Sequence, residues 1–126
     1  MPQLNAIGVI ASDMERSIRF YRLLGLDVPE TPQEDHVETF LSNGVRFMLD
    51  TEDAVRSLRP EWSRADGNQI SIALECATPA EVDETYRRAV GAGFHGEKEP
   101  WDAFWGQRYA QLQDPDGVGV DLYAAL

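Results

Sequence analysis

Cysteine, histidine and long apolar runs are scarce in this sequence of 126 residues. Its one cysteine, Cys76, leaves no partner for a disulfide within the chain, which favours a reducing compartment. No apolar run reaches the length of a membrane span, and the N-terminus lacks the pattern of a secretory signal. We therefore expect a small cytoplasmic protein.

Positive charge is also in short supply. The sequence has 11 Lys and Arg residues against 22 Asp and Glu residues, which gives a formal net charge of −11. Such a surface argues against nucleic acid and anionic membranes as partners, and it mildly favours neutral or cationic ligands. The chain is long enough for one domain with its own core.

One order of elements occurs twice in the sequence, with a period of about 65–70 residues. The first copy is predicted to begin with a strand at 4–11, followed by a helix that starts with the capping box Ser12–Glu15 and ends at Gly25. A polar link at 27–35 comes next and has room for a short edge strand. Two strands then follow, at 36–42 and 45–51, joined across the hairpin signal Asn43-Gly44.

The second copy is predicted to contain a strand at 69–76, a helix with a Thr78–Glu81 capping box and Pro79 at its first position, a polar link that carries His95 and Trp101, and a final hairpin at 103–123.

The final hairpin has two different faces. Ala110, Leu112, Val120 and Leu122 alternate with more polar residues and should pack on a helix. The opposite face carries Tyr109, Gln111, Asp121 and Tyr123, which suits the wall of a pocket. Asp114-Pro115-Asp116-Gly117 supplies the turn between the two strands.

Two motifs in this pattern resemble the vicinal oxygen chelate superfamily, which includes glyoxalase I, bleomycin-resistance proteins and extradiol dioxygenases. They are SDMERSIRFYRLLGL in the first half and DPDGVGVDLY in the second, preceded by WGQRYAQLQ. The resemblance implies an α+β fold of two βαβββ modules whose curved sheets form a cavity, commonly within a homodimer. We expect a single domain, 1–126, with modules at 1–58 and 68–126 joined by the loop 59–67.

The same resemblance places four metal ligands on the cavity face of the metal-dependent relatives. In this sequence those positions fall on or near Ala6, Met48, Gln69 and Asp121. One carboxylate remains, whereas a catalytic divalent site needs about three protein ligands. We therefore expect no metal and no other cofactor.

Nine residues are predicted to bind a ligand; the catalytic residues, if any, are unknown. They are Arg46, Met48, Glu75, Trp101, Trp105, Tyr109, Gln111, Asp121 and Tyr123. Glu75 either pairs with Arg46 or Arg108 or serves the ligand, because a buried carboxylate is costly unless it is paired. Asp121 either serves the ligand or is an ordinary strand residue.

Aromatic residues gather between Trp101 and Tyr123, and they either form the rim of a pocket or a dimer interface. His36 and His95 are expected on the surface, although His36 would be a good proton shuttle if it faced the cavity. Cys76 is expected to pack as a small hydrophobic residue.

These observations favour a metal-free protein that binds a hydrophobic or planar small molecule, for example to sequester an antibiotic. The alternative is an enzyme of the same superfamily: a metal-dependent lyase or dioxygenase, or a metal-free isomerase that uses Asp121 or His36. A partner-binding domain without a pocket is a third possibility.

Overall fold

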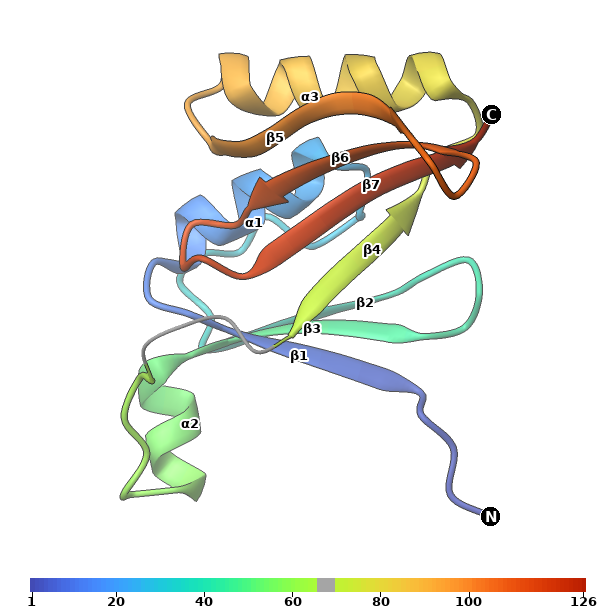
Figure 1. Cartoon of the computed structure of the whole chain (residues 1–126). Coiled ribbons are helices and arrows are strands. Elements are labelled where there is room, and N and C mark those ends of the chain that lie inside the picture. The colour runs from blue at the N-terminus through green and yellow to red at the C-terminus, as the bar shows by residue number, and fades with distance from the viewer. Residues whose placement is uncertain (66–69) are drawn as a thin grey trace. The chain divides into compact units, whose positions relative to one another are not determined.

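The computed structural model describes residues 1–65 and 70–126, in two compact units (Figure 1). The first unit, Met1–Ala65, contains β1 (Ala6–Ala11), α1 (Met14–Leu23), β2 (His36–Phe40), β3 (Arg46–Thr51) and α2 (Glu52–Leu58). The second unit, Asp66–Leu126, contains β4 (Ser71–Glu75), α3 (Pro79–Gly91), β5 (His95–Ala103), β6 (Gln107–Gln113) and β7 (Gly119–Ala125).

The predicted α+β class and the repeated order of elements are confirmed. The predicted modules, 1–58 and 68–126, lie within the two units. Three expectations stay predictions: that the two modules form a single domain, that residues 59–67 form the loop between them, and that the sheets enclose a cavity. The start of the predicted strand at Gln69 lies outside the described residues.

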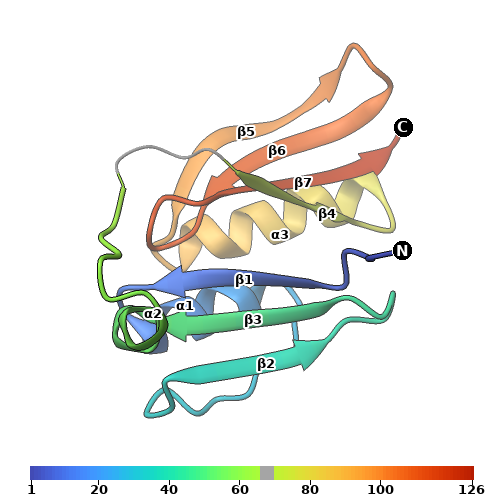
Figure 2. The same ribbon diagram turned by 90° about the horizontal axis from the view of Figure 1, so that it is seen from below.

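The first unit is a sheet of three strands in the order β1-β3-β2, with β1 parallel and β2 antiparallel to β3. Helix α1 covers one face of this sheet (Figure 2). The apolar stripe of α1 includes Ile18, Phe20 and Tyr21, all buried, and the Tyr21 ring lies 4.8 Å from that of Phe47. This stripe buries the helix against the sheet, as amphipathic spacing requires.

Residues 27–35 are irregular, with a turn at 32–33, and no edge strand is present there. Two prolines in this stretch, Pro29 and Pro32, have no N–H to donate to a neighbouring strand. The first unit therefore has two strands after its helix, and the second unit has three.

The second unit is a sheet of four strands in the order β4-β7-β6-β5. Helix α3 packs on one face of β5, β6 and β7 (Figure 1). The aliphatic face of the final hairpin is buried there, as predicted, with Leu112 and Val120 at 0% exposure and Leu122 at 1%. The other face of the same strands is left without a helix from this unit.

Strand β5 corrects the prediction of a polar link around His95 and Trp101. It pairs antiparallel with β6 but contains two register shifts, one between Gly96 and Lys98 and one between Lys98 and Trp101. Each shift inserts one extra residue on β5, as in a β-bulge.

The helix caps agree with the sequence in one module and differ in the other. Thr78 caps α3 by accepting from the Glu81 N–H at 3.2 Å, as predicted. Helix α1 is capped by Asp13 rather than Ser12: the Asp13 carboxylate accepts from the Arg16 N–H at 3.1 Å. Serine and aspartate are both good N-cap residues, and Asp13 has the extended backbone that an N-cap residue adopts.

Asp114 forms the turn between β6 and β7 as predicted. Its Oδ1 accepts from the N–H groups of Asp116 and Val118, both at 2.8 Å, and its side chain is buried. Gly117 adopts a φ of 86°, a region that glycine enters without steric cost. Among the described residues, no helix is long and apolar enough to span a membrane.

Candidate functional site

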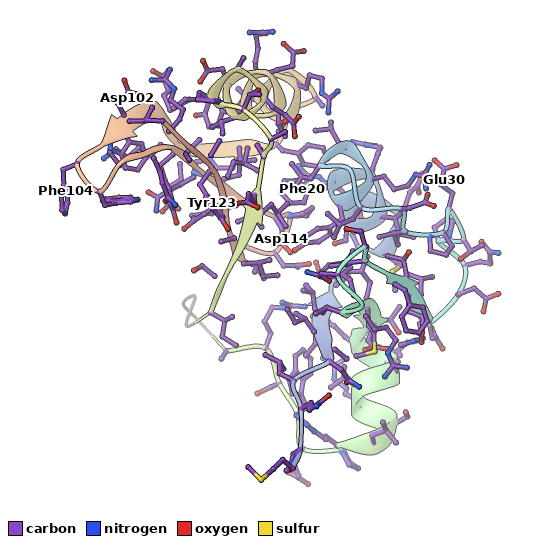
Figure 3. All side chains as sticks on the ribbon, turned by 90° about the vertical axis from the view of Figure 1, so that its right-hand side faces the viewer. Phe20, Glu30, Asp102, Phe104, Asp114 and Tyr123 are labelled. Carbon is purple, nitrogen blue, oxygen red and sulfur yellow. The ribbon has the colours of Figure 1, made fainter. Side chains whose placement is uncertain are left out.

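The helix-free face of the second sheet carries a row of residues that crosses all four strands. In this row Trp101 pairs with Tyr109, Tyr109 pairs with Tyr123, and Tyr123 pairs with Glu75. Adjacent strands lie about 4.8 Å apart, so side chains that are paired across strands are in contact range. Tyr123 is labelled on this face in Figure 3.

A second row, parallel to the first, carries the polar residues of the face. Lys98 pairs with Gln111, Gln111 pairs with Asp121, and Asp121 pairs with Ala73. Six of the seven predicted ligand residues of the second module are therefore brought together on one face: Glu75, Trp101, Tyr109, Gln111, Asp121 and Tyr123.

The aromatic rings contact one another in a continuous cluster. The ring centroids of Trp101 and Tyr109 are 5.5 Å apart, those of Trp105 and Tyr109 are 5.2 Å apart, and those of Trp101 and Trp105 are 6.1 Å apart, all edge to face. Tyr109 and Tyr123 are stacked with centroids 6.3 Å apart. We call Trp101, Trp105, Tyr109 and Tyr123 the aromatic cluster.

Phe104, at the tip of the hairpin between β5 and β6, extends the cluster into solvent. Its ring lies 5.1 Å from that of Trp105, but its side chain is 97% exposed and points away from the sheet (Figure 3). Trp105 is 48% exposed. Both predicted roles of these two residues, the rim of a pocket and a dimer interface, stay predictions.

Hydrogen bonds fix the orientation of two rings in the cluster. The indole N–H of Trp105 donates to Gln107 Oε1 at 2.9 Å, and the hydroxyl of Tyr109 donates to Asp121 Oδ2 at 2.5 Å. Burial, together with the hydrogen bond to Asp121, raises the pKa of Tyr109 to about 12. Tyr109 therefore keeps its proton at neutral pH and donates a hydrogen bond to Asp121.

Glu75 corrects the prediction of a buried, paired carboxylate. Its side chain is exposed at the end of β4. Arg108 lies on the opposite, helix-facing side of the sheet, where its guanidinium contacts Asp83 at 2.9 Å and Asp102 at 3.1 Å. Arg46 contacts Glu38 at 3.5 Å. Among the described residues, these arginines are thus engaged elsewhere, and Glu75 remains a ligand-binding prediction.

Arg46 and Met48 belong to the first unit and lie on the face of β3 opposite Phe47, whose ring contacts Tyr21 of α1. On that face Arg46 contacts Glu38, which also bonds His36: His36 Nδ1 lies 2.6 Å from Asp50 Oδ1, and its Nε2 lies 2.7 Å from Glu38 Oε1. The hydrogen bonds to Glu38 and Asp50 raise the pKa of His36, since both favour its protonated form.

His36 was expected on the surface and is about half exposed, but it lies on the same sheet face as Met48. Sequence spacing could have found it, because His36, Glu38 and Phe40 alternate on β2 just as Arg46, Met48 and Asp50 do on β3. The carboxylate on each ring nitrogen stabilises the protonated form of His36, in which both nitrogens donate hydrogen bonds.

The residues expected at the metal positions do not fit a divalent centre. Ala6 has no donor atom, the Met48 thioether suits soft metals, and Gln69 lies outside the described residues. Asp121 is a carboxylate, but it is hydrogen-bonded to Tyr109. Within residues 1–65 and 70–126, no group of three or more His, Cys, Asp or Glu side chains is placed to hold a metal ion.

Cys76 packs as expected. Its side chain is buried, and burial raises the pKa of its thiol to about 11, so the nucleophilic thiolate is scarce at neutral pH.

A hollow of about 500 Å³ lies between α3 and β5, on the side of the sheet opposite the aromatic cluster. Its lining includes Tyr86, Val90, Glu99 and Pro100. None of the predicted ligand residues lines it.

Comparison with known proteins identifies a family model that matches the sequence. The model of the Glyoxalase/Bleomycin resistance protein/Dioxygenase superfamily matches residues 3–122. No curated protein matches the sequence.

Several solved structures share the fold. A family enzyme from Burkholderia phytofirmans PsJN has a TM-score of 0.85 at 17% identity, covering 99% of this chain and all (100%) of its own. A hypothetical protein from S. aureus has a TM-score of 0.83 at 22% identity, with 99% and 95% of the two chains covered. A glyoxalase-related enzyme from Fulvimarina pelagi has a TM-score of 0.82 at 19% identity, with 98% and 88% covered.

At these identities the solved structures establish the fold, whereas the family model establishes descent. The match to that model spans nearly the whole sequence, which confirms the resemblance seen in the two motifs. The chain belongs to the Glyoxalase/Bleomycin resistance protein/Dioxygenase superfamily.

Proposed function

We propose that the protein binds a hydrophobic or planar small molecule on the aromatic cluster, without a resident metal. The observation that carries this proposal is the row of aromatic residues across β5, β6 and β7, with Trp105 and Tyr109 fixed by hydrogen bonds. Rings that are already ordered lose little conformational entropy when a ligand stacks on them. Each stacking contact would contribute about 0.5–1.5 kcal/mol.

Sequestration of an antibiotic is the concrete form of this proposal. We further propose that the protein acts as a homodimer in the cytoplasm. Sedimentation equilibrium tests the dimer: a single species with the mass of one chain would contradict it.

Tryptophan fluorescence tests the binding proposal. Trp62 would add background, because it lies in the first unit, where Arg56 and Arg64 stand 5.3 and 5.7 Å from its ring. A Trp62→Phe background leaves Trp101 and Trp105 as the only reporters in the sequence. Titration with a panel of planar antibiotics should quench their emission, and a Trp105→Ala variant should weaken binding by about tenfold. No quenching across the panel at high concentration would contradict the proposal.

Catalysis is the alternative function. The geometry supports it less, since Tyr109 keeps its proton and His36 is flanked by two carboxylates. Elemental analysis of protein purified without chelators tests the metal-dependent form: one divalent ion per chain would reverse this ranking.

A further inference from the structure

Lys98 is the only lysine in the sequence, and its ammonium lies over the face of Trp101, 3.9 Å from the ring centroid. In a regular strand, residues three apart point to opposite faces. The register shift between Lys98 and Trp101 places both on the same face, since Lys98 pairs with Gln111 and Trp101 with Tyr109. The irregular strand β5 thus brings a cation onto the aromatic cluster.

Such a placement has a specific physical cause. The face of an indole ring carries negative potential and attracts a cation within about 6 Å of its centroid. Lys98 is itself exposed, so its ammonium keeps access to water while it contacts the ring. The Trp101 face therefore attracts positive charge, and the Lys98 ammonium occupies it.

Negative charge borders the same rings. The Asp121 carboxylate lies next to Tyr109, which donates to only one of its oxygens, and Glu75 follows Tyr123 in the aromatic row. The molecule as a whole carries a net charge of −11. A cation on this face would thus meet ring faces and carboxylates together, whereas a neutral ligand would use the rings alone.

We propose that the aromatic cluster selects organic cations, in which a quaternary ammonium is joined to a planar ring, and that Lys98 is a tethered competitor for the Trp101 face. A ligand of this class displaces the Lys98 ammonium and takes its place over the indole. This inference deepens the proposed function and rests on it, because it names the ligand class of the same surface.

The first test compares benzyltrimethylammonium with neopentylbenzene, its neutral isostere, by fluorescence in the Trp62→Phe background. Both have the same shape, so a difference in Kd reports the charge. We expect the cation to bind at least about tenfold tighter. Equal binding of the two overturns the inference and leaves the proposed function standing. If neither compound binds and the planar antibiotics also fail, both are overturned.

Two variants test the roles of the charges. Lys98→Met keeps the length of the side chain but removes the competing ammonium, so the Kd of benzyltrimethylammonium should fall about threefold to tenfold. Asp121→Asn keeps an acceptor for Tyr109 but removes a negative charge, so the Kd should rise by a similar factor.

Arg87→Met is the matched control for net charge. It also removes one positive charge, but from the exposed side of α3, where Arg87 pairs with Glu84. It should change the Kd less than twofold. If Arg87→Met tightens binding as much as Lys98→Met does, the effect is long-range and the competitor role of Lys98 is wrong.

Displacement of Lys98 can be observed directly. Reductive methylation with ¹³C-formaldehyde keeps the positive charge and labels only the N-terminal amine and Lys98. The methyl signal of Lys98 should lie upfield because of the Trp101 ring current, and benzyltrimethylammonium should move it to the position of a free dimethyl-lysine. A Lys98 signal that stays fixed while the cation binds overturns the competitor role.

Discussion

The proton between Tyr109 and Asp121 is held on the phenol. Burial is the first cause of the raised Tyr109 pKa and the Asp121 carboxylate the second, since both oppose a phenolate. The pair therefore presents a carboxylate whose charge is partly compensated by a donated hydrogen bond. This arrangement suits recognition of a ligand better than abstraction of a proton.

Asp121→Asn should lower the Tyr109 pKa from about 12 towards its ordinary value of 10, because the carboxylate no longer opposes the phenolate. Absorbance of phenolate near 295 nm against pH measures this shift among the four tyrosines of the sequence. Tyr109→Phe assigns the signal, since the transition near pH 12 should be missing. An unchanged titration curve in Asp121→Asn would contradict the hydrogen bond.

His36 connects β2 to its neighbour β3 through hydrogen bonds to two carboxylates. Its imidazole bonds Glu38 on its own strand and Asp50 across the pair, and Arg46 stands beside Glu38 at 3.5 Å. The pKa of His36 is raised above 6.5, so the stability it contributes is fully present below pH 6.5 and is lost as the pH rises through the folded-state pKa.

His36→Gln should remove this pH dependence. The same hydrogen bond lowers the pKa of Glu38 below 4.5, so its contribution is lost as the pH falls through that folded-state value. The free energy of unfolding of His36→Gln should therefore differ from that of the natural sequence most between pH 4.5 and 6.5, with little difference at pH 9. Urea denaturation at these pH values measures it; a constant difference at all pH values would contradict this ion pair.

At the scale of elements, the turn between β6 and β7 depends on one side chain. Asp114→Ala leaves the N–H groups of Asp116 and Val118 without their acceptor, which should lower the free energy of unfolding by about 1–3 kcal/mol. Asp114→Asn is the matched control, because its amide oxygen can accept the same bonds. Urea denaturation should rank Asp114→Asn clearly above Asp114→Ala, and equal losses would show that the negative charge matters instead.

Strand β5 approaches α3 so closely at Gly96 that a side chain has no room. A Cβ there would overlap the Tyr86 hydroxyl and lie 2.8 Å from Val90 Cγ2. Gly96→Ala should therefore lower the free energy of unfolding by about 1–3 kcal/mol. Gly91→Ala, at the end of α3, meets nothing within 4 Å and should be neutral or slightly stabilising. Thermal denaturation of the two variants compares them, and equal effects would contradict the close approach.

Local patterns predicted most elements because local chemistry decides them. Asp114-Pro115-Asp116-Gly117 contains both the acceptor and the glycine that its turn needs, and Thr78-Pro79 marks the start of α3. Strand β5 escaped prediction for the opposite reason. Gly96, Pro100 and the charged residues between them are poor strand formers, and two extra residues break the alternation that would have revealed it.

The sequence predicted the candidate-site residues that lie on regular strands, where side chains alternate between the two faces of the sheet. Tyr109, Gln111, Asp121 and Tyr123 share a face, as their spacing requires. Lys98 could not be placed there, because only the register shift turns it towards Trp101. The burial of Glu75 was predicted wrongly, since β4 is the outer strand of its sheet and leaves that side chain exposed.

At the scale of the whole molecule, the net charge of −11 opposes compaction. Raising NaCl from about 10 mM to about 200 mM shortens the Debye length from about 30 Å to below 10 Å and should raise the thermal midpoint. Differential scanning calorimetry measures it. A midpoint that falls with NaCl would mean that attractive ion pairs, such as Arg108 with Asp83 and Asp102, outweigh the repulsion.

The burial of Cys76 has a practical consequence for work with this molecule. A thiol that is shielded and seldom ionised reacts slowly with maleimides and with other thiols. The sequence contains no second cysteine, so a cysteine introduced at the exposed Phe104 would be the one rapidly labelled position. A fluorophore attached there, at the tip of the hairpin that carries Trp105, would report on ligands from just beside the rings they contact.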